Sequence, residues 1–199
     1  MKIYYYYTLM SPWAYLGSER FYLLKNKYDF NIVHCPLDHT TLFSLSGGVP
    51  LSKRAEQRKV YRLMELKRWK EILNLPIKIE PKNFPPSDII TPSCMILTLN
   101  EEEDQNKLTH KLLEAIWVED KDIGNHKILE KICIECNLDF QNLINKQKNM
   151  LENFKNMAPL AARNNIFGSP SYVLDDEIFW GQDRLDLLER ELKNKYGNI

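Results

Sequence analysis

The fold is decided near the N-terminus by residues 3–17, which read Ile3-Tyr4-Tyr5-Tyr6-Tyr7-Thr8-Leu9-Met10-Ser11-Pro12-Trp13-Ala14-Tyr15-Leu16-Gly17. The run of β-forming residues predicts a strand over residues 2–7. Serine followed by proline is preferred at the start of a helix, which predicts a helix from Pro12 to about residue 26. Unpaired N–H groups and the helix dipole favour a negative charge beside Ser11. Ser11 is therefore either a plain helix cap or part of a site for an anion or a thiolate.

Composition limits the class of protein. The 199 residues are 44% apolar and 11% aromatic, which is enough for a hydrophobic core. Basic and acidic residues number 27 each, so we expect no nucleic-acid partner. The chain has neither a signal-peptide pattern nor an apolar run near the ~20 residues of a membrane helix, so we expect a cytoplasmic protein without a membrane partner. Four scattered cysteines fit a reducing compartment.

The order of elements predicts a split α/β architecture. Residues 30–37 predict a second strand, parallel to the first, and residues 171–180 predict a hairpin that turns at Asp175-Asp176. Residues 183–196 predict a closing amphipathic helix. The β-α-β and β-β-α ends, separated by helices, have the topology of a thioredoxin-like fold with a large all-helical insertion. We expect a thioredoxin-like domain from residues 1–52 and 165–199, with residues 53–164 as the inserted helical domain.

The inserted segment begins after a loop that carries Ser44, Gly48 and Pro50. Helical spacing predicts helices over residues 53–74, 89–101, 105–120, 125–136 and 139–164. Between Lys53 and Lys70 there are eight basic residues against two acidic ones. This run is either a solvated helix face or a positive rim that attracts a carboxylate ligand. The proline-rich stretch 75–88 is expected to be extended, with Phe84 as a pocket residue.

The start of the first helix excludes one reaction. Thioredoxin-type redox enzymes need two cysteines there, whereas this chain has Ser11-Pro12-Trp13-Ala14. No disulfide can form at these positions, but a hydroxyl at a helix N-terminus can hold a thiolate that a ligand brings. Glutathione is the obvious ligand of this kind. The Cys133-Ile134-Glu135-Cys136 motif follows no strand, so we interpret its cysteines as packing residues.

Two late motifs have open interpretations. Ser169-Pro170 is either a turn that starts an edge strand or a cis peptide whose backbone pairs with a peptide-like ligand. Asp183, after Gln182, is either the N-cap of the last helix or a partner for the α-amino group of a ligand. The four histidines form no pair with metal-ligand spacing, so we expect no metal site.

Five segments together carry a resemblance to a known family: Ser11–Gly17, Gly47–Leu51, Tyr61–Trp69, Phe167–Val173 and Phe179–Leu188. With them, the chain resembles the 2-hydroxychromene-2-carboxylate isomerases, relatives of kappa-class glutathione transferases and DsbA-type oxidoreductases. The resemblance implies a homodimer and a glutathione-dependent cis-trans isomerisation of 2-hydroxychromene-2-carboxylate or a similar aromatic 2-oxo acid, in aromatic catabolism. A kappa-like glutathione transferase and a non-catalytic thiol-binding protein of thioredoxin fold are the alternatives.

The resemblance also implies roles for individual residues. Ser11 holds the glutathione thiolate, beside Pro12 and Trp13, and Ser169 before a cis Pro170 pairs with the glutathione backbone. Gln182 and Asp183 bind the γ-glutamyl end. Trp13 and Phe84 form a flat apolar wall for the aromatic carboxylate. Kappa-type relatives carry Asn where this chain has Gly48, and Lys53 is a candidate to supply the missing polar contact.

Overall fold

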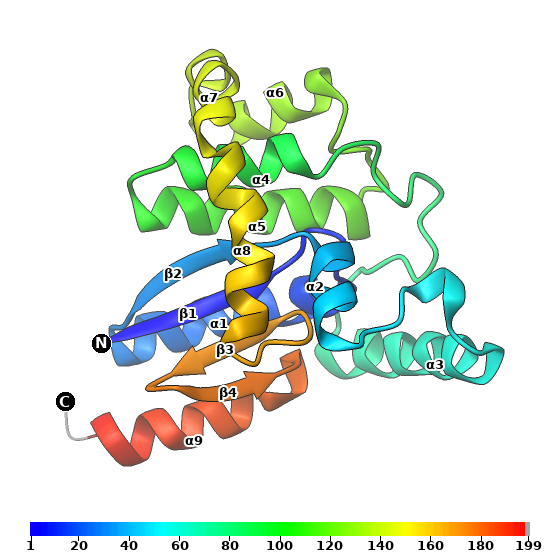
Figure 1. Cartoon of the computed structure of the whole chain (residues 1–199), viewed down its shortest axis with the longest axis vertical. Coiled ribbons are helices and arrows are strands. Elements are labelled where there is room, and N and C mark those ends of the chain that lie inside the picture. Colours follow the sequence, from blue (N-terminus) through cyan, green and yellow to red (C-terminus); the bar gives the residue numbers. More distant parts are fainter. Residues whose placement is uncertain (198–199) are drawn as a thin grey trace.

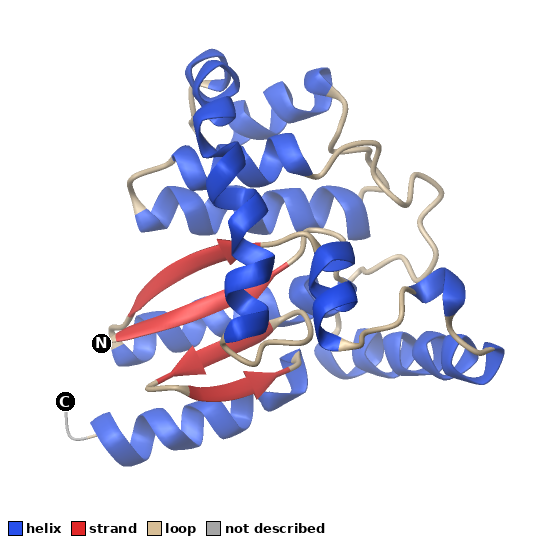
Figure 2. Cartoon of the chain, in the orientation of Figure 1, coloured by secondary structure: helices blue, strands red, loops and turns tan. Residues whose placement is uncertain are grey.

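A four-stranded mixed sheet organises the chain, in a computed structural model that describes residues 1–197 (Figures 1 and 2). Its strand order is β2-β1-β3-β4. The strands are β1 (Lys2–Tyr7), β2 (Asn31–Pro36), β3 (Ser171–Leu174) and β4 (Glu177–Trp180). β1 runs parallel to β2 and antiparallel to β3, and β3 and β4 form the hairpin. Both predicted ends, β-α-β and β-β-α, are present.

The alternation along β1 divides the core between the two faces of the sheet. Tyr5 and Tyr7 are fully buried in the larger hydrophobic cluster, where Tyr5 stacks on Tyr172 of β3 with ring centroids 5.3 Å apart. That cluster includes residues of α1 (Pro12–Tyr28), α5 (Glu102–Trp117) and α9 (Leu185–Tyr196). Tyr6 points to the other face, toward α2 (His39–Ser46) and α8 (Leu151–Arg163). Helices therefore cover both faces.

The helical segment between β2 and β3 is larger than the sheet. It comprises α2, α3 (Glu56–Leu73), α4 (Ile90–Thr98), α5, α6 (His126–Glu135), α7 (Phe140–Lys146) and α8. α3 lies at the end of the sheet where α1 begins, apart from α4 to α7 (Figure 1). The larger cluster joins Met95, Leu112 and Leu129 of these helices to the sheet, so the two predicted segments share a core. The division into two domains stays a prediction.

Two local expectations are wrong. The stretch expected to be a loop contains α2, because Asp38 caps the helix by accepting hydrogen bonds from the N–H groups of Thr40 and Thr41, both at 3.1 Å. The burial of Leu42 then fixes this short helix against α8. The helix expected over residues 139–164 is broken into α7 and α8 by a 3-10 turn at Gln147–Met150.

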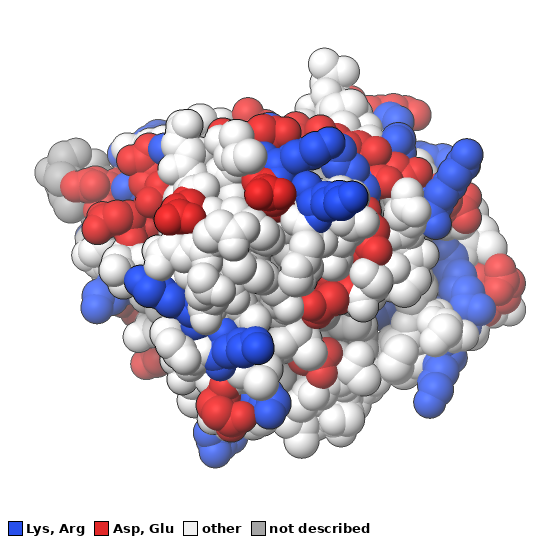
Figure 3. All heavy atoms as spheres, turned by 90° about the horizontal axis from the view of Figure 1, so that it is seen from above, with Lys and Arg blue, Asp and Glu red and all other residues white. Residues whose placement is uncertain are grey.

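Charges of both signs are interleaved on the surface. The face seen from above carries acidic and basic side chains next to one another (Figure 3). Along the chain, oppositely charged residues three or four positions apart form ion pairs within a helix, such as Lys107 with Glu103 at 2.7 Å. Among residues 1–197, no helix combines the length and apolarity that crossing a membrane requires.

Candidate active site

Ser11 is the N-cap of α1, as predicted. Its Oγ accepts a hydrogen bond from the N–H of Ala14 at 3.2 Å and donates one to the carbonyl oxygen of Ser169, also at 3.2 Å. The side chain is buried, with 6% of the residue exposed. Within residues 1–197, the N–H of Trp13 finds no backbone or side-chain acceptor, because Pro12 begins the helix and the first N–H groups precede the regular hydrogen bonds. A hydroxyl and a free N–H thus lie together at a helix N-terminus.

The loop before β3 is tied to the start of α1. The Ser169–Pro170 peptide bond is cis, in line with one of the two interpretations. Ser169 accepts a hydrogen bond at its Oγ from the N–H of Thr8 at 3.0 Å, and the carbonyl oxygen of Pro170 accepts one from the N–H of Gly181 at 2.9 Å. The two motifs, 158 residues apart, therefore form one site.

A cavity of about 570 Å³ adjoins these loops. Four of the six predicted cofactor-binding residues line it: Trp13, Ser169, Gln182 and Asp183. The other two, Pro12 and Pro170, and the predicted catalytic Ser11 are not among its lining residues. Basic side chains lie around it, from Arg54, Arg58, Arg62 and Arg184. Asp183 is exposed and pairs with Arg184 at 2.7 Å, and it caps no helix because α9 begins only at Leu185. The arrangement offers cations for carboxylates and one carboxylate for an amine.

Gln182 is held in place by a residue that sequence reasoning missed. Arg20 of α1 donates hydrogen bonds from Nη1 to the Oε1 of Gln182 at 3.1 Å and to its carbonyl oxygen at 3.3 Å. Its Nη2 pairs with Asp186 at 2.6 Å. Close approach also needs Gly17, since a Cβ there would lie 2.9 Å from the Cβ of Gln182. No local pattern indicates a contact across 162 residues.

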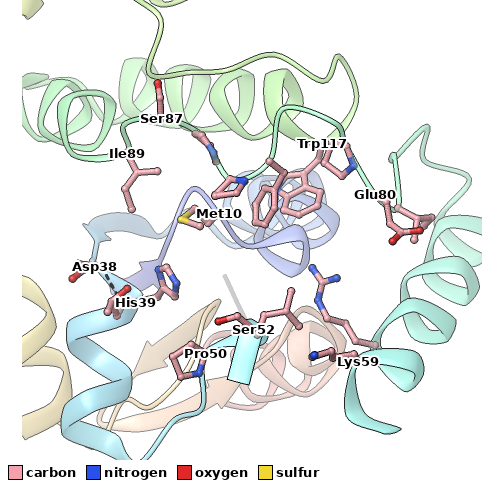
Figure 4. A pocket seen from close by; sticks show the side chains of 18 of the residues that line it. Met10, Asp38, His39, Pro50, Ser52, Lys59, Glu80, Ser87, Ile89 and Trp117 are labelled. Atoms are coloured by element: carbon pink, nitrogen blue, oxygen red, sulfur yellow. Dashed lines mark hydrogen bonds between the residues drawn. The ribbon is translucent and has the colours of Figure 1, made fainter. Parts of the chain in front are cut away.

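A second, larger cavity of about 960 Å³ lies between α2, α3 and the proline-rich segment (Figure 4). Phe84 packs on Trp117 with ring centroids 5.0 Å apart, and both line the cavity with Met10. His39 and Lys59 also point toward it (Figure 4). Trp13 and Phe84 were expected in one wall, but they line different cavities because α3 lies between the two spaces. Arg62 of α3 lines both.

The expected contribution of Lys53 is not supported. This lysine lies in the 3-10 turn Leu51–Lys53, is exposed and is not among the residues that line either cavity. The turn directs its side chain outward, whereas Lys59 and Arg62 lie one and two helical turns inside α3. Gly48 is required by packing, because a Cβ there would overlap the ring of Phe43. An asparagine at position 48 would therefore require the side chain of Phe43 to move.

The four cysteines stand apart from this site. Cys35, Cys94, Cys133 and Cys136 are buried and free. Burial raises the pKa of Cys133 to about 12 and that of Cys136 to about 11, which disfavours the reactive thiolate. The described part of the chain contains no group of three His, Cys, Asp or Glu residues arranged to hold a metal ion.

Known proteins resemble the chain over nearly its whole length. A 2-hydroxychromene-2-carboxylate isomerase of Sphingobium xenophagum is 25% identical over 94% of this chain and 96% of its own length. A 2-hydroxychromene-2-carboxylate isomerase from Pseudomonas sp. (strain C18) is 25% identical over 93% of this chain and 87% of its own length. A solved 2-hydroxychromene-2-carboxylate isomerase aligns with a TM-score of 0.83 at 21% identity, covering 98% of this chain and 95% of that one.

A thiol-disulfide enzyme shares the fold as well. The cytosolic disulfide reductase DsbM from Pseudomonas aeruginosa, solved with GSH, aligns with a TM-score of 0.67 at 15% identity, covering 97% of this chain and 100% of its own. The family model for the DSBA-like thioredoxin domain matches residues 2–193. With the sheet order and helical insertion described above, this match establishes that the chain belongs to the family of DsbA-like thioredoxin domains.

Proposed function

We propose that the protein is a glutathione-dependent cis-trans isomerase of 2-hydroxychromene-2-carboxylate or a similar aromatic 2-oxo acid. The observation that carries the proposal is Ser11, a hydroxyl at a helix N-terminus in a fold whose redox members use cysteine there. The names of the full-length relatives support the choice of an isomerase. The DsbM complex supports glutathione as a ligand that this fold accommodates.

The residues of the smaller cavity fit glutathione chemically. Glutathione carries two carboxylates and an α-amino group, and the cavity offers Arg54 and Arg58 for the former and Asp183 for the latter. Ser169 lines this cavity, and its backbone would pair with a peptide-like ligand once the Ser11 hydroxyl leaves its carbonyl oxygen. A thiol near Ser11 meets two donors, the hydroxyl and the free N–H of Trp13. Both favour the thiolate over the thiol.

Ser11 has to exchange its hydrogen-bond partner for this role. In the structure its proton goes to the carbonyl oxygen of Ser169, and rotation of the hydroxyl about the Cβ–Oγ bond redirects the proton to a bound sulfur while Oγ still accepts from Ala14. When bound, glutathione supplies a thiolate that adds reversibly to the conjugated acid, so that a double bond becomes a rotatable single bond until elimination restores it. The chain keeps this thiolate deprotonated and presents the aromatic acid from the larger cavity, which Met10 and Phe84 line.

A kappa-like transferase would use the same thiolate, so the reaction itself must be tested. The assay is the isomerisation of 2-hydroxychromene-2-carboxylate, followed by absorbance with and without glutathione. We expect turnover only with glutathione, and S-methylglutathione, which has no ionisable thiol, should not replace it. Equal rates without glutathione would contradict the proposal. Faster conjugation of 1-chloro-2,4-dinitrobenzene than isomerisation would favour the transferase.

A further inference from the structure

Arg62 occupies a special position on α3. It is the residue of the basic run that lines both cavities, the smaller one with Trp13 and Gln182 and the larger one with Phe84 and Trp117. A charge at this junction is within reach of a molecule in either space. Arg62 is also half-buried, unlike Lys67 and Arg68 on the same helix, which are exposed.

The guanidinium of Arg62 has no carboxylate partner. Across residues 1–197, no carboxylate oxygen lies within 4.0 Å of its nitrogens, whereas Lys59 pairs with Glu56 and Arg68 with Glu65. Burial lowers the pKa of Arg62, the neighbouring Arg54 lowers it further, and the exposed Glu80 raises it. A partly desolvated cation without a counter-ion is unfavourable by itself. An anionic ligand would relieve that cost.

The larger cavity determines what kind of anion fits. Its walls are mostly apolar, with the tilted ring pair of Phe84 and Trp117 on one side. Two of its four acidic residues are engaged elsewhere: Asp38 caps α2 and Asp88 accepts hydrogen bonds from the start of α4. Of the other two, Glu56 pairs with Lys59 and Glu80 is exposed. Lys59 pairs with Glu56 at 3.5 Å, whereas Arg62 has no such pair among residues 1–197, so Arg62 gains more from an anionic ligand. A flat apolar body with one carboxylate matches this combination.

We propose that Arg62 is the specificity-determining residue of the larger cavity and binds the carboxylate of a flat aromatic acid in a bidentate salt bridge. The planar guanidinium fork matches a carboxylate with two parallel hydrogen bonds, which an ammonium group cannot reproduce. The aromatic body then lies against Phe84 and Met10, and Met10 directly precedes Ser11. This inference rests on the proposed isomerase function and adds the residue that selects acids over neutral aromatics.

Calorimetric titration with 2-naphthoate and its neutral counterpart 2-naphthamide tests the role of Arg62 without requiring turnover. The folded wild-type protein is expected to bind the acid at least about 10-fold more tightly than the amide, because the neutral amide cannot form the charge-assisted pair with Arg62. Arg62→Gln should weaken naphthoate binding about 10- to 100-fold and remove the preference. Arg62→Lys should recover only part of it, and Arg68→Gln on the same helix should behave as wild type.

Each other result overturns the inference. Naphthoate that binds Arg62→Gln as tightly as wild type, or does not bind wild type at all, excludes the assigned role. Weaker glutathione binding in Arg62→Gln with unchanged naphthoate binding would assign the guanidinium to the cofactor instead. The proposed function is tested by a different measurement: it would be contradicted by turnover at the same rate without glutathione. Even then, the preference for the acid and its dependence on Arg62 could still be measured.

Discussion

The hydroxyl of Ser11 donates its proton to the carbonyl oxygen of Ser169, 3.2 Å away, across the junction between the two ends of the chain. The same Oγ accepts from the N–H of Ala14, so it closes α1 and joins it to the loop before β3. The bond that Oγ accepts is local to the helix start, whereas the proton that it donates across the chain can be redirected to a ligand. Ser11 therefore has a structural role and a proposed catalytic role that mutation can separate.

Replacing Ser11 by alanine should affect the rate far more than stability. Loss of the cap is expected to lower the free energy of unfolding by about 1 kcal/mol, measured by urea denaturation. Loss of a donor to a developing or bound anion is expected to lower kcat by about 10²- to 10³-fold. Ser44→Ala is the control, since Ser44 is exposed and its Oγ donates a hydrogen bond to the nearby carbonyl oxygen of Thr41. A Ser11→Ala rate within twofold of wild type would contradict the role.

Arg20 is predicted to be a positioning residue for Gln182. Arg20→Met removes both hydrogen bonds to Gln182, so the KM for glutathione should rise about 10-fold while kcat stays within about twofold, because uniform binding is lost. Asp186→Asn is the matched control: it breaks the exposed ion pair with Arg20 and leaves the bonds to Gln182. Equal effects of the two substitutions would show that only the surface pair matters.

The sequence contained the local features of this site but not its long-range contacts. The strand, Ser11 and Pro12 predict a helix start from neighbouring residues alone, and the structure has it. The role of Arg20 is not predicted by any local pattern, because its partner Gln182 lies 162 residues away. For Arg62 a signal existed: Arg58, Arg62, Glu65 and Trp69 recur at helical spacing and all line the smaller cavity. This spacing does not single out Arg62, because a run of basic residues does not by itself show which of its side chains face a cavity.

The cysteines are predicted to be unreactive in the native protein. Burial raises the pKa of Cys35 and Cys133 to about 12 and of Cys94 and Cys136 to about 11, so little thiolate exists at pH 8. Ellman's reagent should label fewer than one thiol per chain in minutes without denaturant and all four in guanidinium. Insulin reduction should be absent. Rapid labelling of Cys133 and Cys136, or a disulfide between them, would revive the redox interpretation.

His34 is predicted to make stability depend on pH below neutrality. It lies in a buried network: the Tyr7 hydroxyl is 3.1 Å from its Nδ1 and 2.9 Å from Thr109 Oγ1, and Asn106 Oδ1 is 2.8 Å from its Nε2. Burial lowers the pKa of His34 from 6.5 to about 4, with the hydrogen bond to Asn106 opposing. A neutral ring that donates from Nε2 to Asn106 accepts the Tyr7 proton at Nδ1, and a second proton on the ring would force the Tyr7 hydroxyl to donate to Thr109 instead.

The sign of the pH effect follows from that lowered pKa. Between pH 6.5 and 4 the unfolded chain binds a proton that folded His34 does not, so the stabilisation is complete above pH 6.5 and is lost as the pH falls toward 4. The loss from this group is about 3 kcal/mol. His39 and His110, whose pKa values are also lowered by burial, act in the same direction. Urea unfolding at pH 7.5, 6 and 5 should therefore give a dependence of the unfolding free energy on pH that His34→Gln reduces. A His34→Gln slope equal to that of wild type would mean that folding does not lower the pKa of His34.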